Sequence, residues 1–135
     1  MGSRFSPAIR KFVASRANFR CEYCKKPEIV ANFPFHIEHI ISKQHGGTDD
    51  LNNLAYSCSW CNWKKGPNIA TVLVEGGSLL PLFNPRNQTW SDHFRVEEGA
   101  IIGFSDIAEG TIQLLEMNKA ELIIERKELM EAGFY

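Results

Sequence analysis

The spacing of apolar residues predicts a helix near the start of the chain. Ser6-Pro7 is a favourable helix start, because a serine side chain caps free backbone amides and proline fits the first helical position. The residues that follow place a set of apolar side chains on one helical face: Ile9, Phe12, Val13 and Ala17.

The middle of the chain predicts two strands followed by a short helix. Residues 33–41 are rich in aromatic and β-branched side chains, which favour a strand. A polar loop over 42–53 separates this strand from a short second strand at 54–57. Residues 60–65 predict a helix that ends at Gly66-Pro67, since glycine and proline terminate helices.

The second half predicts a mixture of strands and helices. Residues 70–74 fit either a strand or a helical turn, and residues 94–104 predict a hairpin. Two helices are expected over 107–117 and 118–130. The apolar stripe expected on the last helix consists of Leu122, Ile123, Leu129 and Met130.

Charge is distributed unevenly over a chain whose 135 residues fit one domain. The net charge is only −1, but residues 1–70 hold ten Lys/Arg and five Asp/Glu, a net charge of +5. Residues 71–135 hold five Lys/Arg and eleven Asp/Glu, a net charge of −6. A basic first half indicates a polyanionic partner, with ordinary charge scatter as the alternative.

Cellular context follows from what the sequence lacks. No apolar run approaches the roughly 20 residues that span a bilayer, and no secretory signal opens the sequence. We therefore expect a cytoplasmic protein that does not bind membranes. In that reducing compartment, paired C-x-x-C motifs indicate metal binding rather than disulfides.

The four cysteines form two such pairs, Cys21/Cys24 and Cys58/Cys61. Four thiolates in a tetrahedral array suit a closed, structural Zn²⁺ site. The 33 residues between Cys24 and Cys58 must then form a folded excursion, which agrees with two paired strands. Two disulfides, buried free thiols and an iron–sulfur cluster are the alternatives.

Several ordered motifs between the cysteines resemble a known family. They are Glu38-His39-Ile40-Ile41, Gly46-Gly47, Asn53-Leu54, Cys58-x-x-Cys61-Asn62 and Lys65-Gly66. In order and spacing they resemble the HNH endonucleases. The resemblance implies an α+β fold with a ββα-metal (His-Me finger) core and zinc knuckles built from four cysteines. We expect this core at 16–67, with a small α/β C-terminal extension at 68–135 packed on it, so that 1–135 form a single domain.

The resemblance also implies a role for each motif residue. His39 matches the general base that activates water, a role suited to an imidazole because it exchanges protons near neutral pH. Asn53 matches the asparagine that pins the loop around His39. Glu38 and Asn62 match two ligands of a catalytic ion, and two oxygen ligands favour Mg²⁺ or Mn²⁺. Asn62 replaces the usual last histidine, which gives an H-N-N variant.

The expected reaction is metal-dependent hydrolysis of DNA phosphodiester bonds by an endonuclease that needs no small-molecule cofactor. Lys43, Lys64 and Lys65 are expected to contact the phosphate backbone. One alternative is a non-catalytic, zinc-stabilised module that binds nucleic acid. A zinc deaminase is the other, since His36-Ile37-Glu38 and Cys58-x-x-Cys61 fit its signature, but it leaves Cys21 and Cys24 without a role.

Other residues compete for these roles. Asn52 is an alternative to Asn53. Three further histidines have structural or surface explanations: His36 as a packing or supporting residue, His45 as an exposed loop residue and His93 as a structural one. Trp60 and Trp63 are expected to pack in the core around the second knuckle.

Overall fold

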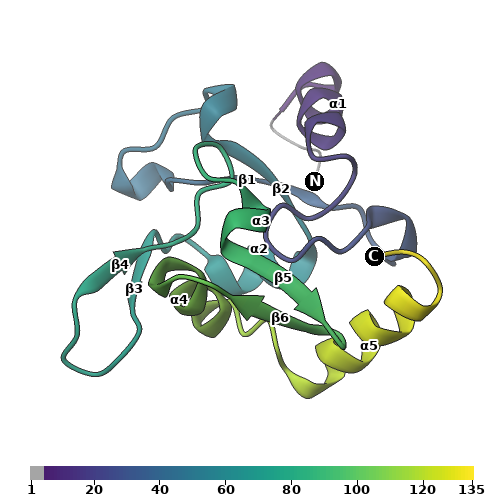
Figure 1. The fold of residues 1–135 in the computed structure, drawn as a ribbon. Coiled ribbons are helices and arrows are strands. Elements are labelled where there is room, and N and C mark those ends of the chain that lie inside the picture. The colour runs from purple at the N-terminus through teal and green to yellow at the C-terminus, as the bar shows by residue number, and fades with distance from the viewer. Residues whose placement is uncertain (1–4) are drawn as a thin grey trace.

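The computed structural model describes residues 5–135. Within this range, helices alternate with three antiparallel two-stranded hairpins (Figure 1). The α-helices are α1 (Pro7–Arg16), α2 (Ser59–Lys65), α3 (Trp90–His93), α4 (Asp106–Leu114) and α5 (Ala120–Glu131). The hairpins pair β1 (His36–His39) with β2 (Leu54–Ser57), β3 (Ala70–Val72) with β4 (Leu79–Pro81), and β5 (Phe94–Glu97) with β6 (Ala100–Gly103).

Helix α1 begins as the sequence predicts. The Ser6 hydroxyl accepts a hydrogen bond from the Ile9 amide at 3.2 Å, and Pro7 opens the helix. The buried face is narrower than expected, because Val13 is fully buried whereas Phe12 is 48% exposed. At the other end of α1, Arg16 donates to the Leu54 carbonyl at 2.7 Å and joins the helix to β2.

The β1–β2 hairpin and α2 form a compact ββα unit. Glu38 lies opposite Ala55 in the antiparallel register, and α2 follows β2 directly. The side chain of Cys58 caps α2 by accepting from the Cys61 amide at 3.4 Å. Strand β1 is shorter than the predicted strand over 33–41, because the chain around Phe35 bonds instead to Glu28, whose carboxylate accepts from the Phe35 amide at 2.8 Å.

The loop between the two strands depends on its adjacent glycines. Gly46 has a φ of +92°, a conformation that side chains disfavour. A Cβ at Gly47 would lie 1.7 Å from the Ile41 carbonyl oxygen, so only glycine fits there. These glycines let the loop fold back against the end of β1.

The C-terminal half confirms the predicted hairpin and helices and adds two elements. Residues 70–72 form a strand, paired with β4, which the sequence did not indicate, and α3 was also unexpected. Helix α4 packs against β3, β4 and β6. The expected apolar stripe of α5 is only half-buried, and the buried residue of this helix is Arg126. Its guanidinium donates to the carbonyls of Gly99 at 2.6 Å and Met117 at 3.0 Å.

Three side chains join the C-terminal half to the first cysteine pair. Arg86 forms an ion pair with the buried Glu22. The Trp90 indole donates to the Tyr23 carbonyl at 2.8 Å, and the Tyr135 hydroxyl donates to the Cys24 carbonyl at 3.0 Å. One continuous apolar cluster accordingly runs from α1 through both strands of the β1–β2 hairpin to α4.

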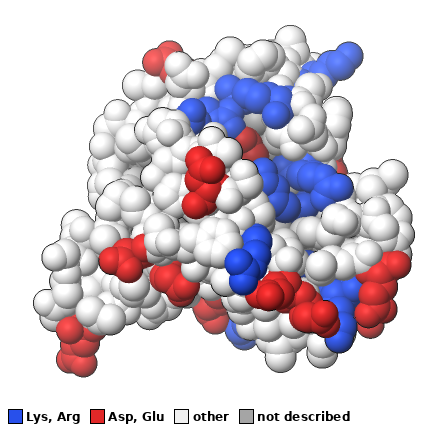
Figure 2. Space-filling view, in the orientation of Figure 1, with Lys and Arg blue, Asp and Glu red and all other residues white. Residues whose placement is uncertain are grey.

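The charge asymmetry of the sequence is visible on the surface. On the face in Figure 2, Lys and Arg side chains gather over α1 and the segment that follows it. Asp and Glu are concentrated on the opposite side of this face, toward α5 and the β3–β4 hairpin. None of the helices within 5–135 has the length and apolar character needed to cross a membrane.

Candidate active site and zinc centre

The four cysteines converge although they come from two distant turns. Cys21, Cys24, Cys58 and Cys61 are all buried, and their sulfur atoms lie within 4.8 Å of one another. The Cys24 and Cys58 sulfurs are 3.7 Å apart. Sulfurs bound to zinc at about 2.3 Å in a tetrahedron lie roughly 3.8 Å from each other. The spacing therefore fits a structural zinc ion.

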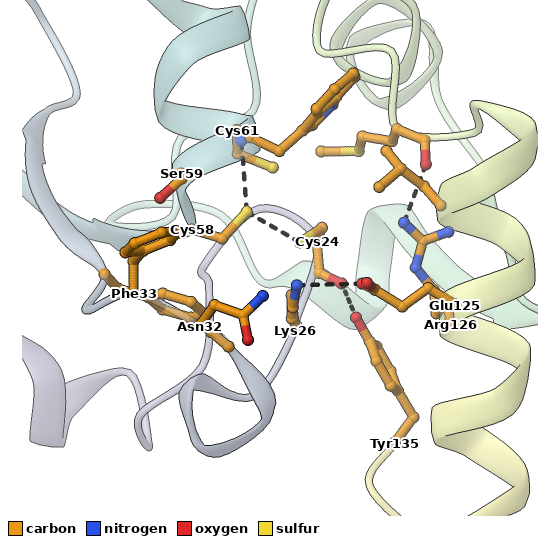
Figure 3. Close-up of a pocket in the computed structure, with 15 residues that line it drawn as sticks. Cys24, Lys26, Asn32, Phe33, Cys58, Ser59, Cys61, Glu125, Arg126 and Tyr135 are labelled. Atoms are coloured by element: carbon orange, nitrogen blue, oxygen red, sulfur yellow. Dashed lines mark hydrogen bonds and ion pairs between the residues drawn. The ribbon is translucent and has the colours of Figure 1, made fainter.

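The four thiols interact closely with one another. Their mutual hydrogen bonds lower the pKa of Cys24 and raise the pKa of Cys58 and Cys61. A cavity of about 140 Å³ lies beside the cluster (Figure 3). Cys24 and Cys58 lie on one side of it, with Arg126 and Tyr135 across from them. The C-terminal segment thus forms the opposite wall of this cavity.

Glu38 lies in β1 and is only 6% exposed. One carboxylate oxygen accepts a hydrogen bond from the Tyr23 hydroxyl. The other oxygen lies 3.3 Å from the ammonium of Lys65. Burial raises the pKa of Glu38 to about 7, and the nearby Lys65 charge and the Tyr23 hydrogen bond oppose this shift.

His39 follows Glu38 at the end of β1 and is partly exposed. Its Nε2 atom lies 2.7 Å from an Asp49 carboxylate oxygen. The tautomer in which Nε2 donates to Asp49 leaves the lone pair on Nδ1, which is the state that a general base requires. The ring of Phe5 lies beside the imidazole, with 5.8 Å between ring centroids.

Asn62, on α2, lines the same pocket as Glu38 and His39. The pocket has a volume of about 290 Å³, and Lys43 also contributes to its wall. Within residues 5–135 no hydrogen bond engages the Asn62 side chain, so its amide oxygen remains available to a ligand in the pocket. Glu38, His39 and Asn62 therefore line one pocket, and carboxylate and amide groups are the kinds of oxygen donors that Mg²⁺ and Mn²⁺ accept.

Asn53 makes three hydrogen bonds across the loop. Its Oδ1 atom accepts from the Ile41 amide at 2.9 Å, while Nδ2 donates to the carbonyls of Ile41 at 2.9 Å and Thr48 at 2.8 Å. The Asn53 carbonyl also accepts from the Ile40 amide at 2.9 Å. Of the two adjacent asparagines, Asn53 is therefore the one that holds the loop next to His39, and Asn52 is exposed.

The three lysines expected to contact DNA lie in different environments. Lys43 is exposed at the pocket, with its ammonium 3.1 Å from Asp49. Lys64 pairs with Glu116 and lies over the Trp63 ring, 4.3 Å from its centroid. Lys65 is only 1% exposed and bonds to interior carbonyls, so the predicted phosphate contact of Lys65 is wrong.

The remaining histidines and tryptophans differ in part from expectation. His93 is structural, with Nδ1 2.7 Å from the Ser105 hydroxyl, and His45 is exposed, both as predicted. His36 does not pack in the interior, since it is exposed and contacts the Ser59 hydroxyl at 3.2 Å. Trp60 is partly buried, but Trp63 is 67% exposed and is not a core residue.

Two residues of the site were not identified from the sequence. Asp49 contacts His39 across a gap of ten residues, and Tyr23 contacts Glu38 from within the first C-x-x-C pair. The Asp49-Asp50 pair in the polar loop was a weak signal for the first contact. Nothing in the local sequence around Tyr23 distinguishes a supporting tyrosine from an ordinary core aromatic residue.

The hairpin and helix that carry this site lie beside a four-cysteine cluster, which makes this an α+β domain with a possible zinc site. Residues 21–68 match the family model described as HNH endonuclease. This segment of the chain therefore belongs to the HNH endonuclease family, as the motifs indicated. Comparisons with curated proteins and with solved structures gave no significant match.

Proposed function

We propose that the protein is a divalent-metal-dependent endonuclease that hydrolyses DNA phosphodiester bonds. The observation that carries this proposal is the shared pocket of Glu38, His39 and Asn62, located within the segment that matches the family. These three residues come from the end of β1 and from α2, and they open onto one volume large enough for a phosphate group and an ion.

Each residue has a distinct task in this proposal. His39 takes a proton from the attacking water through Nδ1, while Asp49 holds the Nε2 side of the ring. Glu38 and Asn62 supply oxygen ligands for Mg²⁺ or Mn²⁺. When bound, such an ion stabilises negative charge on the phosphate oxygens and assists the leaving group. Asn53 keeps the loop, and with it Asp49, in register with β1.

DNA binding in this proposal relies on the basic first half of the chain. Lys43 lies at the pocket opening, where a phosphate next to the reacting one would pass. Lys64 is partly neutralised by Glu116 and contributes less. Contacts of this kind are to the backbone and do not depend on base sequence.

The non-catalytic module remains the second candidate because of one observation. Both carboxylate oxygens of Glu38 already have protein partners, Tyr23 and Lys65. In a purely structural role, these contacts would be sufficient to explain Glu38. Each carboxylate oxygen has two acceptor sites, however, so one protein donor on each leaves room for a metal ion.

Cleavage of supercoiled plasmid by the zinc-loaded protein tests the two candidates. We expect nicked or linear DNA with added Mg²⁺ or Mn²⁺, and no cleavage with Ca²⁺ or with zinc alone. His39→Ala should abolish most cleavage, whereas His45→Ala, which alters an exposed histidine of the adjoining loop, should not. Metal-independent DNA binding without any cleavage would favour the non-catalytic module.

We also propose that residues 1–135 work as one domain in the cytoplasm. The contacts of Arg86, Trp90 and Tyr135 with the first knuckle support treating the C-terminal half as part of the same unit. Four free thiols arranged for zinc support a reducing compartment.

A further inference from the structure

We propose that Tyr23 is a positioning residue that connects the zinc knuckle to the catalytic metal ligand Glu38. This inference rests on the proposed function, because it assigns Glu38 as a ligand. In this proposal the first C-x-x-C turn has two functions. Cys21 and Cys24 hold zinc, and the tyrosine between them fixes the carboxylate of the neighbouring active site.

The contact that carries the inference is a buried hydrogen bond. Tyr23 is 1% exposed and Glu38 is 6% exposed, and the Tyr23 hydroxyl donates to Oε1 of Glu38. Lys65 approaches the other oxygen, Oε2, at 3.3 Å. Two donors from different elements therefore fix the rotation of the carboxylate. Glu38 also lines the pocket shared with Asn62, and each carboxylate oxygen keeps one further acceptor site for a ligand there.

The position of Tyr23 is itself determined by the knuckle. Its backbone amide points to the Cys21 sulfur at 3.4 Å, a contact that forms part of the turn around the cysteine cluster. Its carbonyl accepts from the Trp90 indole at 2.8 Å. A shift of the knuckle would therefore move the Glu38 carboxylate.

Groups that hydrogen-bond to a metal ligand typically change metal affinity or activity by about 10–100-fold when they are removed. Tyr23→Phe removes only the hydroxyl and keeps the buried ring. We therefore expect the affinity for Mn²⁺ to fall by roughly 10–100-fold. Zinc content and folding should be retained. High Mn²⁺ should restore much of the cleavage, because the general base is untouched.

The chain offers a matched control in Tyr56. This tyrosine is also buried and also donates to a glutamate, with 2.6 Å between its hydroxyl and Glu28, but the contact lies away from the pocket. Tyr56→Phe therefore removes the same type of hydrogen bond without touching a proposed ligand. Mn²⁺ binding, measured by electron paramagnetic resonance on zinc-loaded protein, should be unchanged in this variant.

Glu38→Gln separates failure of this inference from failure of the proposed function. If Glu38→Gln weakens Mn²⁺ binding but Tyr23→Phe does not, Glu38 is a ligand and the role of Tyr23 is refuted. If Glu38→Gln binds Mn²⁺ as the wild type does, the proposed metal site is wrong and the inference fails with it. Weak binding in both variants, with normal binding in Tyr56→Phe, supports both.

A measurement on the unmodified sequence covers the case in which Tyr23→Phe does not fold. With ¹³C-labelled tyrosine, added Mg²⁺ should shift the Cζ resonance of Tyr23, because a cation on Glu38 changes the acceptor of its hydroxyl. The Tyr56 resonance should stay in place. A Tyr23 resonance that does not respond while the Glu38 carboxyl signal shifts would overturn the inference.

Discussion

The ammonium of Lys65 lies 3.3 Å from the Glu38 carboxylate and is almost completely buried. The same ammonium donates to the carbonyls of His39 at 3.1 Å and Ile40 at 3.0 Å. Lys65 thus joins the last turn of α2 to the end of β1, where the candidate base lies. Its charge therefore lies in the interior of the candidate site and not on the protein surface.

Breaking this buried pair should destabilise the fold strongly. Lys65→Met removes the partner of a buried carboxylate and the donor to two carbonyls, so we expect a loss of about 3–5 kcal/mol in the free energy of unfolding. Lys64→Met, at the neighbouring position near the surface, should change little. Urea unfolding of zinc-loaded proteins measures both. A Lys65→Met protein as stable as the Lys64→Met protein would show that the buried pair is not needed for folding.

The raised pKa of Glu38 predicts a pH dependence of stability. A carboxyl group whose pKa rises from 4.5 to about 7 on folding binds its proton more tightly in the folded state. Its stabilising contribution is complete below pH 4.5 and is lost as the pH rises through 7. Relative to Glu38→Gln, the wild type should lose up to about 3 kcal/mol of unfolding free energy over this window.

Measurements between about pH 5.5 and 8 with no added Mg²⁺ or Mn²⁺ check this expectation. The comparison with Glu38→Gln cancels the titration of the cysteine cluster, which both proteins share. A difference between the two proteins that does not vary with pH would contradict the burial-driven shift.

The sequence was most informative where a residue type has only one common use. The paired cysteines predicted the cluster, and the resemblance predicted that Asn53 pins the loop next to His39, where the structure places its hydrogen bonds. Strand β2 and the hairpin over 94–104 were also predicted correctly. In each case a local rule and the tertiary structure favour the same conformation.

The sequence was misleading where tertiary contacts override a residue's usual preference. Lysine is normally a surface residue, and only the convergence of Glu38 with two strand-end carbonyls explains the burial of Lys65. Arg126 is buried for a similar reason, since it satisfies the carbonyls of Gly99 and Met117. The opposite case is Trp63, an apolar residue that α2 places on the surface. Contacts between distant segments cannot be inferred from spacing alone.

Asn53 and Asn52 offer a direct comparison of two adjacent amides. Asn53→Ala removes three side-chain hydrogen bonds, each contributing about 1 kcal/mol, and should loosen the loop from Ile41 to Thr48. Faster amide hydrogen exchange in that loop should accompany a loss of plasmid cleavage, with zinc retained. Asn52→Ala should leave both unchanged. Reduced cleavage in Asn52→Ala with a normal Asn53→Ala would reverse the assignment.

Loss of one cysteine should have consequences beyond the metal. The cluster joins the turn before β1 to the start of α2, and zinc binding free energy is part of the folding free energy. We expect one zinc per wild-type chain by elemental analysis. Cys58→Ser should lose the zinc and the cooperative unfolding transition. Ser59→Ala, at the next position, is the control and should keep both. Reduced protein that is fully folded without zinc would contradict this prediction.

The salt dependence of DNA affinity should separate the surface lysines. Lys43 is exposed at the pocket, so Lys43→Gln should remove one phosphate contact and lower the slope of log K against log salt by about 1 for all duplex sequences. Lys127 is similarly exposed and also pairs with an acidic residue, Glu98, but it belongs to the acidic half of the chain. Lys127→Gln should therefore leave the slope unchanged.

Fluorescence anisotropy of a labelled duplex gives the slopes. Both lysine changes are made in the His39→Ala protein, so that the duplex is not cleaved during the measurement. Equal slopes for Lys43→Gln and Lys127→Gln would mean that DNA does not pass over the pocket formed by Glu38, His39 and Asn62.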